Sequence, residues 1–247
     1  QTSVISFLEA IQLGPLLCDG AMGTLLHGYG VSLERCLDEI NLSQPGLVLR
    51  AHSEYLAAGA DVIETNTFGA NPIKLEEHDL AGRLAEVNTA GVRLARQAVA
   101  LCGRPAFVAG SVGPLGKGLA PFGPLSVRTA QQAFEEQIAA LAAGGVDLVL
   151  LETFSDLAEI SVALQAAQTV APALPVVAQM TFTEERRTVA GHSPEDVANA
   201  LCGLGATVVG VNCSAGPALV LRVVRRMMAA CPRLLYSAQP NAGYPPR

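Results

Sequence analysis

Acidic and thiol side chains follow short apolar segments of this chain, at the points where those segments end. Asp19 and Glu152 each follow such a segment, and no Lys or Arg lies beside Glu152 in the sequence. A buried carboxylate is costly without a cationic partner, so Glu152 requires a cation from elsewhere in the protein or from a ligand. Cys213 follows another apolar segment and precedes a turn that contains Gly and Pro. These residue types predict a site that combines carboxylates with a thiol.

Each of these residues also has a purely structural interpretation. Asp19 can simply cap the turn that follows it, and Cys213 can be a small buried residue, because free cysteines are often buried. The Gly and Pro residues around Cys213 favour exposure of its thiol. Cys18 and Cys202 lie within a predicted strand and a predicted helix, where core packing is the better interpretation. Cys231 is expected at a helix end, with no partner implied.

The apolar segments that precede these residues predict buried parallel strands. Each is apolar on both faces instead of alternating, which is typical of a parallel strand covered on both sides. The seven segments are residues 16–18, 62–63, 106–109, 148–151, 176–178, 208–211 and 234–236. Helix signals separate them, such as the capping residue Ser126 before a long amphipathic run. The predicted helix stops are Gly59, Gly144 and Gly205.

An internal repeat favours a barrel of βα units. Residues 57–65 and 143–153 both contain a helix stop, an aspartate, an apolar strand and then Glu-Thr. A repeated βα unit is what a (β/α)8 barrel requires, and chemistry in such barrels gathers at the carboxyl ends of the strands. The alternative, an open doubly wound sheet, needs G-x-G-x-x-G after its first strand, and residues 19–24 do not fit it. We therefore predict an α/β fold, a (β/α)8 TIM barrel with about seven βα units in residues 1–247 and the eighth missing.

Three other kinds of site are disfavoured. No Lys lies at a predicted strand end, which argues against a Schiff-base aldolase. Residues 110–118 are rich in glycine, but they miss the spacing of a Walker phosphate loop. A phosphate-binding barrel would need a glycine-rich loop at its last two strands, where only Asn241-Ala242-Gly243 is present.

Composition limits the expected partners and location. The 247 residues include 22 acidic and 16 basic side chains without a Lys/Arg block, so nucleic acid is not an expected partner. The longest uncharged run, residues 160–183, contains Pro172 and Pro175 and predicts a helix end, a turn and a strand, so no membrane partner is expected. Six cysteines form no dense framework, and the first 34 residues contain no Lys or Arg. Both observations favour a reducing, cytoplasmic location.

Six short motifs, in order along nearly the whole chain, resemble those of the homocysteine S-methyltransferase family. One such motif is weak evidence, but six in order are strong. The likeness is greatest to the homocysteine domain of bacterial methionine synthases, and the domain fused to methylenetetrahydrofolate reductase is similar too. The matching stretches are Asp19 to Thr24, Glu64 to Asn71, Gly110 to Pro114, Glu152-Thr153, Gly210 to Pro217 and Gln239 to Gly243.

The resemblance implies zinc-dependent methyl transfer to homocysteine. The family holds Zn²⁺ with three cysteines, one of them in a Gly-x-Asn-Cys motif, so Cys213 is the expected zinc ligand and catalytic residue. The other two are adjacent in a Gly-Gly-Cys-Cys-Gly motif at the eighth strand, and they are expected beyond Arg247. Asn241 is expected to occupy the open zinc position when substrate is absent. Zinc keeps a bound thiol deprotonated and nucleophilic near neutral pH.

The resemblance also implies how the substrate is held. Asp19 and Glu152 are expected to bind the homocysteine ammonium, and the turn amides that follow Asp19 its carboxylate, because a helix N-terminus favours anions. The expected substrate-binding residues are Asp19, Gly20, Ala21, Met22, Gly23, Thr24, Asn66, Thr67, Glu152 and Asn241.

A larger enzyme is implied around this chain. Residues 1–247 are expected to be a homocysteine-binding barrel domain, incomplete at its C-terminus, of a multidomain enzyme that makes methionine. The expected methyl donor is methylcobalamin or methyltetrahydrofolate carried by another domain, so the cobalamin- or folate-binding domains of the same polypeptide are expected partners. The alternative, from another class, is a non-catalytic barrel that binds an amino acid or a partner domain.

Overall fold

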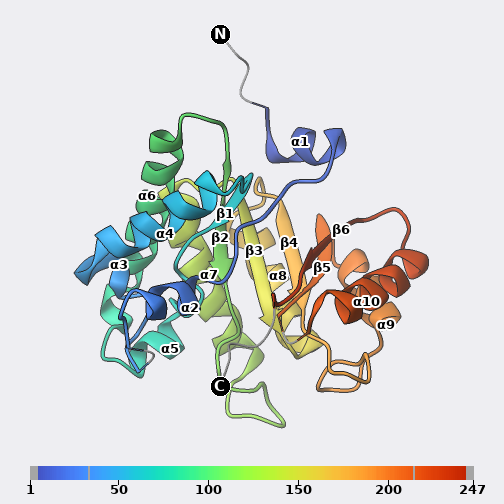
Figure 1. The fold of residues 1–247 in the computed structure, drawn as a ribbon. Helices are drawn as coiled ribbons and strands as arrows, with labels where there is room; N and C mark the ends of the chain where they lie inside the picture. Colours follow the sequence, from blue (N-terminus) through green and yellow to red (C-terminus); the bar gives the residue numbers. More distant parts are fainter. Residues whose placement is uncertain (1–4, 33, 214, 243–247) are drawn as a thin grey trace.

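Strands and helices alternate along the chain in the computed structural model, which describes residues 5–32, 34–213 and 215–242 (Figure 1). Ser214 and Gly243, which belong to two of the matching motifs, lie outside the described residues. The strands are β1 (Val62–Glu64), β2 (Phe107–Val112), β3 (Leu148–Phe154), β4 (Val176–Met180), β5 (Val208–Asn212) and β6 (Leu235–Gln239). The helices are α1 (Phe7–Leu13), α2 (Met22–Gly28), α3 (Ile40–Ser43), α4 (Pro45–Ala57), α5 (Pro72–Glu76), the 3₁₀ helix η1 (Ala81–Arg83), α6 (Leu84–Cys102), α7 (Val127–Gly144), α8 (Leu157–Val170), α9 (Pro194–Gly203) and α10 (Pro217–Ala230).

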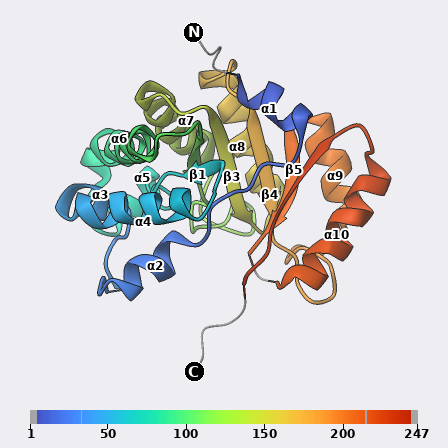
Figure 2. The ribbon, with the colours of Figure 1, turned by 45° about the horizontal axis from the view of Figure 1, so that its top comes forward.

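The six strands form one parallel sheet in the order β1-β2-β3-β4-β5-β6. Each strand therefore lies beside its neighbour in the sequence, which is the order that successive βα units produce. Figures 1 and 2 show that the sheet curves into a half-barrel, with the longer helices arranged along its outer side. The predicted α/β class and parallel sheet are confirmed.

The prediction of about seven βα units is not confirmed, because the first predicted strand is a bridged segment. Cys18 makes one isolated parallel bridge to Val62. The Leu17 carbonyl accepts the Val62 N–H at 3.1 Å, and the Val62 carbonyl accepts the Asp19 N–H at 3.0 Å. The Leu17 N–H donates to Asp61 Oδ2 at 3.0 Å instead of to a backbone carbonyl, so the ladder does not continue toward the N-terminus. The described residues thus contain six strands and one short segment that lies along β1.

Capping residues set the helix boundaries largely as the sequence predicts. Ser126 caps α7, where its hydroxyl accepts the Thr129 N–H at 3.0 Å. The predicted stop at Gly144 is wrong by one residue: Gly144 ends α7, and Gly145 adopts the left-handed conformation with φ 88°. Within the part of the chain that the structure describes, no helix is long and apolar enough to cross a membrane.

A short recurring pattern fixes the start of three strands. In each case a glycine with positive φ follows the helix that precedes the strand. Two residues after this glycine, a polar side chain accepts a hydrogen bond from a backbone N–H of the neighbouring strand or bridged segment that comes earlier in the sequence. The glycines are Gly59, Gly145 and Gly205, with φ of 108°, 88° and 82°. The three hydrogen bonds run from Leu17 to Asp61 at 3.0 Å, from Val108 to Asp147 at 2.7 Å and from Val176 to Thr207 at 3.0 Å. The repeat seen in the sequence therefore has a third copy, in which Thr replaces Asp.

Each strand separates an outer core from an interior core, because successive side chains point to opposite faces of a sheet. Outward residues such as Ile63 and Val149 pack against the helices. Inward residues near the strand beginnings form a second buried cluster, called here the interior apolar layer. Its strand members are Val62, Ala109, Leu148, Leu150, Val177 and Val208.

Helix α1 covers this interior apolar layer. Its residue Phe7 belongs to the same buried cluster, and the Phe7 ring meets the Phe107 ring edge-on, with 5.6 Å between centroids and 83° between planes. Ser6 and Glu9 form a capping box that starts the helix. Figure 1 shows α1 above the end of the sheet where the strands begin. The opposite end, where the strands finish, is left for the candidate site.

Candidate functional site

Polar side chains replace apolar ones in the half-barrel interior where the strands end. Two residues beyond Leu150 of the interior apolar layer, the same face of β3 carries Glu152, and two beyond Val177, β4 carries Gln179. The same alternation applied to the other strands defines the interior polar layer. Its members are Glu64, Ser111, Glu152, Gln179, Asn212, Ser237 and Gln239.

Glu152 is held by hydrogen bonds from two other strands. The Ser111 hydroxyl on β2 donates to Glu152 Oε1 at 2.5 Å, and Asn212 Nδ2 on β5 donates to Glu152 Oε2 at 3.3 Å. Asn212 is itself fixed, because its Oδ1 accepts the Thr153 N–H at 2.8 Å and its Nδ2 donates to Thr153 Oγ1 at 2.7 Å. Thr153 has a φ of 64°, an uncommon conformation for a non-glycine residue. The carboxylate of Glu152 therefore has a defined orientation in the interior.

Glu64 links the two edge strands of the sheet, β1 and β6. Gln239 Nε2 on β6 donates to Glu64 Oε1 on β1 at 2.6 Å, across 175 positions of sequence. The Gln239 carbonyl also accepts the Cys213 N–H at 3.1 Å. One glutamine thus links a buried acid on the first strand to the backbone of the candidate thiol residue after β5.

Asp19 adds a third acid to this end of the interior. Its Oδ2 accepts the Glu64 N–H at 2.9 Å, while its Oδ1 is buried and has no hydrogen-bond partner among the described residues. None of the ion pairs formed between described residues involves Asp19, Glu64 or Glu152. Three half-buried carboxyl groups therefore share this end of the interior, and none of them is paired with a cation among the described residues.

Burial and mutual repulsion change the protonation of these three acids. Burial raises the pKa of Asp19 from 3.8 to about 8, and the charge of Glu152 raises it further. Burial also raises the pKa of Glu64 well above its ordinary value, with added repulsion from Glu152 and Asp19. The pKa of Glu152 is raised by burial and lowered in part by the hydrogen bond from Ser111. Near neutral pH the group holds protons that a bound cation would displace.

Cys18 lies beside the acids but is a poor nucleophile. Burial raises the pKa of its thiol to about 12, and the charges of Glu64 and Asp19 raise it further. Since the thiolate is the reactive form, this cysteine remains protonated and unreactive near neutral pH.

The turn after Asp19 leads into α2 with free backbone amides. Ala21 is the N-cap of α2, and no side chain caps this helix start. The Tyr55 hydroxyl donates to the Ala21 carbonyl at 3.0 Å, and a Cβ on Gly20 would lie 3.0 Å from the Tyr55 ring. A larger residue at position 20 would press on the Tyr55 ring, and glycine avoids this contact. Met22, Gly23 and Thr24 form the first turn of α2.

Asn66 and Thr67 lie outside the interior polar layer. Asn66 Nδ2 donates to the Leu37 carbonyl at 2.7 Å and to Asn41 Oδ1 at 3.1 Å, so both of its amide hydrogens anchor the region of α3. Thr67 is fully buried, donates to the Ser111 carbonyl at 2.8 Å, and packs its methyl group toward Gly91 of α6. The structure therefore gives both residues a positioning role, and their contact with substrate stays a prediction.

Cys213 and Asn241 meet at the turn after β5. Cys213 has a φ of 56°, and its carbonyl accepts the Ala215 N–H at 2.6 Å. The Ala215 carbonyl in turn accepts the Asn241 N–H at 2.9 Å. Residues 5–32, 34–213 and 215–242 contain no group of three His, Cys, Asp or Glu side chains that could hold a metal ion. They therefore fit one thiol ligand of a zinc site and not a complete ligand set.

Several residues of the interior polar layer are absent from the set of site residues predicted from the sequence. Six of the layer's seven members, all except Glu152, were given no role by the motif resemblance. Five of the six follow closely after predicted strands: Glu64, Ser111, Gln179, Asn212 and Gln239. Ser237 gives no signal by itself, although it lies two residues before Gln239 on the same face of β6. Applying the two-residue alternation to every predicted strand would have found all six.

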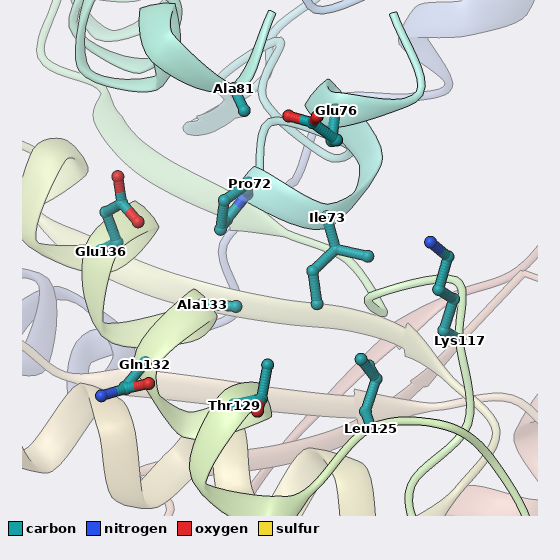
Figure 3. Close-up of a pocket in the computed structure, with 10 residues that line it drawn as sticks. All are labelled: Pro72, Ile73, Glu76, Ala81, Lys117, Leu125, Thr129, Gln132, Ala133 and Glu136. Atoms are coloured by element: carbon teal, nitrogen blue, oxygen red, sulfur yellow. The ribbon is translucent and has the colours of Figure 1, made fainter. Parts of the chain in front are cut away.

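A surface pocket of about 430 Å³ lies elsewhere, on the outer side of the molecule (Figure 3). It is formed by α5, α7 and the loop that contains Lys117. Its lining residues are Pro72, Ile73, Glu76, Ala81, Lys117, Leu125, Thr129, Gln132, Ala133 and Glu136. None of them belongs to the interior polar layer, so this pocket is separate from the candidate site.

Comparison with known sequences identifies a family over most of the chain. Residues 16–247 match the family model described as Homocysteine S-methyltransferase. The methionine synthase of Mycobacterium tuberculosis (strain ATCC 25618 / H37Rv) is 31% identical over 251 residues, which cover 96% of this chain and 21% of that protein. The methionine synthase of Mycobacterium leprae (strain TN) matches with the same identity and coverage. This chain thus spans about one fifth of the length of these curated relatives.

Comparison with solved structures agrees with the family match. The metallated form of the homocysteine methyltransferase MmuM from Escherichia coli has a TM-score of 0.83 at 26% identity, covering 96% of this chain and 87% of the other. The apo form of the same protein has a TM-score of 0.72 at 25% identity, covering 92% and 82%. Both structures are similar to this chain along nearly its whole length.

Proposed function

The chain belongs to the homocysteine S-methyltransferase family, and from that premise we propose that its interior polar layer binds homocysteine for methylation to methionine. The observation that carries this proposal is the group of three half-buried acids, Asp19, Glu64 and Glu152, without a paired cation among the described residues. Clustered acids that are largely withdrawn from water are stabilised by a ligand that brings positive charge. The ammonium of an amino acid supplies that charge and donates three hydrogen bonds.

The acids receive the ammonium in defined positions. Asp19 Oδ1 has no partner and is free to accept from it, and Glu152 is already oriented by Ser111 and Asn212. When the ammonium enters, the carboxyl groups release protons, because a nearby positive charge favours their ionised form. Glu64 remains tied to Gln239 and holds the opposite strand edge in place.

The carboxylate of the amino acid is proposed to face the turn at Gly20 to Thr24. The backbone amides at the start of α2 have no side-chain cap, and Asp19 immediately precedes them. Ammonium and carboxylate are attached to one carbon atom in an amino acid, so their binding groups have to be neighbours. The sequence order Asp19, turn, α2 satisfies that requirement.

Cys213 is proposed as one zinc ligand, with Asn241 close to it. Zinc, when bound, keeps a thiol ionised and nucleophilic near neutral pH. The Cys213 N–H donates to the Gln239 carbonyl, and backbone hydrogen bonds through Ala215 link Cys213 to Asn241. Two further cysteine ligands are proposed outside residues 1–247.

The rest of the proposal concerns the longer protein. Because the curated relatives are about five times as long as the matching region, we propose that this chain is a homocysteine-binding domain of a larger enzyme. Further βα units would close the half-barrel into a (β/α)8 barrel. Methylcobalamin or methyltetrahydrofolate on another domain is the proposed donor, and methionine formation with each donor in turn identifies which one is used.

Calorimetric titration of the protein with two ligands tests the binding proposal. Homocysteine carries the ammonium, and 4-mercaptobutanoate has the same thiol and carboxylate without it. In Glu152→Gln we expect homocysteine to bind about 100-fold more weakly, because one partner of a buried charge pair is lost. The affinity for 4-mercaptobutanoate is expected to change less than about 3-fold, because it makes no ammonium contact.

Two controls separate this result from general damage. Glu136→Gln, on the exposed surface of α7, is expected to bind homocysteine as the unaltered protein does. Equal weakening of both ligands in Glu152→Gln would contradict the proposed ammonium contact. Tight homocysteine binding without methyl transfer from either donor would support the alternative, a non-catalytic barrel that binds an amino acid.

Zinc content tests the role of Cys213. In a protein that also contains the two cysteines proposed outside residues 1–247, Cys213→Ser is expected to lose stoichiometric zinc, and Cys102→Ser, at the end of α6, is expected to keep it. Full zinc occupancy in Cys213→Ser would exclude this residue as an essential ligand.

A further inference from the structure

Two thiols meet on the outer side of the half-barrel, away from the interior polar layer. Cys231 Sγ lies 2.9 Å from Cys202 Sγ, although the two residues are 29 positions apart in the sequence. Both side chains are half-buried, and both cysteines are unpaired in the structure. This distance is shorter than the contact distance of two non-bonded sulfur atoms. The sequence alone implied no partner for Cys231, and the structure places Cys202 beside it.

The backbones of both cysteines are fixed. Cys202 lies in the last turn of α9, where its carbonyl accepts the Gly205 N–H at 3.1 Å. Cys231 is the C-cap of α10, where its N–H donates to the Met227 carbonyl at 3.0 Å. The Tyr236 hydroxyl donates to the Cys231 carbonyl at 2.7 Å. Two neighbouring helix ends thus hold the thiols against each other, and a disulfide requires the sulfurs to approach by only about 0.9 Å more.

We propose that Cys202 and Cys231 form a reversible disulfide by exchange with a low-molecular-weight disulfide. One protein thiolate attacks a sulfur of the small disulfide, which forms a mixed disulfide and releases one small thiol after protonation. The second protein thiol loses its proton and attacks the protein sulfur of the mixed disulfide, releasing the second small thiol. Two protein thiols are oxidised by two electrons, and one small disulfide is reduced to two thiols.

The cross-link would enclose one complete strand of the sheet. The residues between Cys202 and Cys231 include β5, the Asn212–Cys213 end of that strand and α10. The disulfide would therefore join the helices on either side of the strand that leads to the candidate site. It involves no residue of the interior polar layer, so it is independent of the proposed function.

To test this proposal, the purified protein is incubated with excess oxidised glutathione. It is then unfolded in a denaturant that contains a chelator, and its free thiols are counted. We expect two fewer thiols, a mass decrease of about 2 Da, and recovery of both after dithiothreitol. Tryptic digestion should join peptide 188–222 to peptide 227–233. Because peptide 188–222 also contains Cys213, the digest is repeated with Cys202→Ser, in which the joined peptide is expected to be absent.

The oxidised protein is also expected to be more stable to heat. Closing a loop of this length predicts a midpoint roughly 5–15 °C higher by circular dichroism. Cys202→Ser and Cys231→Ser are expected to lose this shift, and Cys102→Ser, a half-buried thiol at the end of α6, is expected to retain it. Stable glutathione adducts on Cys202 or Cys231, an unchanged thiol count, or a joined peptide that persists in Cys202→Ser would each overturn the proposal. If a variant does not fold, fragmentation of the joined peptide from the unaltered protein by tandem mass spectrometry assigns the bond, because it separates Cys202 from Cys213.

Discussion

The interior apolar layer and the interior polar layer are built on the same strands and the same faces, but they differ in how completely their groups are satisfied. Leu148 and Leu150 are 2% and 4% exposed and have only apolar neighbours in their cluster. One step further along the strands, Asp19 and Gln179 each keep a buried oxygen without a hydrogen-bond partner among the described residues. The apolar side chains where the strands begin therefore stabilise the fold. The polar side chains where the strands end include oxygen atoms without a hydrogen-bond partner, and a ligand can donate to them.

Because of this difference, we expect mutations in the two layers to have opposite effects on stability and on ligand affinity. Substitutions in the apolar layer should cost stability and leave ligand affinity intact. Neutralising substitutions in the polar layer should cost affinity and leave stability unchanged or improved.

The largest effect is expected in the apolar layer, from Leu150→Ala. Removal of this buried side chain leaves a cavity, and we expect the free energy of unfolding to fall by about 3 kcal/mol. Urea unfolding followed by circular dichroism measures it, since the chain contains no Trp. Val189→Ala, whose side chain is 77% exposed, is the matched control and should change stability by less than about 0.5 kcal/mol. A selective loss of homocysteine affinity in Leu150→Ala, with stability retained, would break the contrast between the layers.

A smaller, pH-dependent effect of the opposite sign is expected from Asp19→Asn. Folded Asp19 keeps its proton up to about pH 8, whereas the unfolded residue releases it near 3.8. The folded state therefore binds more protons between these values, and the unaltered protein loses stability as the pH rises through this window. Asparagine cannot ionise, so the stability advantage of Asp19→Asn should grow steadily as the pH rises from 5 to 8.

Unfolding at pH 5, 6.5 and 8 without ligand measures this advantage. Asp156→Asn, which caps α8, is the control, because its hydrogen bond at 2.8 Å to the Ala158 N–H is a structural cap. Asparagine caps a helix about as well as aspartate, so that variant should show little change in stability, and no trend, across the three values. An advantage of Asp19→Asn that stayed constant with pH would show that burial does not raise the pKa of Asp19.

The smallest effect on stability is expected from Gln179→Leu, which places an apolar side chain at one position of the interior polar layer. The change removes the hydrogen bond from Gln179 Nε2 to Ser237 Oγ at 3.0 Å, but it also removes the buried oxygen that lacks a partner. We expect a net gain of about 0.5 kcal/mol in unfolding free energy. Gln165→Leu, on the exposed side of α8, should give no gain. A loss above about 1 kcal/mol would mean that the hydrogen bond to Ser237 outweighs the unsatisfied oxygen.

Much of the fold was predictable because each strand is short, apolar and followed by a helix with clear caps. Ser126 and Gly205 mark helix ends in the sequence, and the structure uses both. The first predicted strand failed for a physical reason: hydrophobicity at 16–18 indicates burial, but the hydrogen bonds available to a segment between Pro15 and Gly20 support a single bridge.

The candidate site was only partly predictable. Asp19 and Glu152 were found because an acid after an apolar run is an anomaly that local sequence reveals. Glu64 and Gln239 form a pair across 175 positions, and no local pattern shows that two distant strands face each other across the interior. Such a contact depends on the curvature of the whole sheet, so it follows only from the three-dimensional arrangement.

The hydrogen bonds made by Asp61, Asp147 and Thr207 suggest an order of assembly on the ribosome. Each of these side chains reaches back to a backbone N–H of the strand or segment before it, which left the exit tunnel earlier. A newly made strand therefore remains without this contact until the following unit emerges, and each new unit secures its predecessor. These contacts join consecutive units, 31 to 44 positions apart, and so they close much shorter loops than the contact between Glu64 and Gln239. Short loops carry a lower entropic cost of closure, which suits folding during translation.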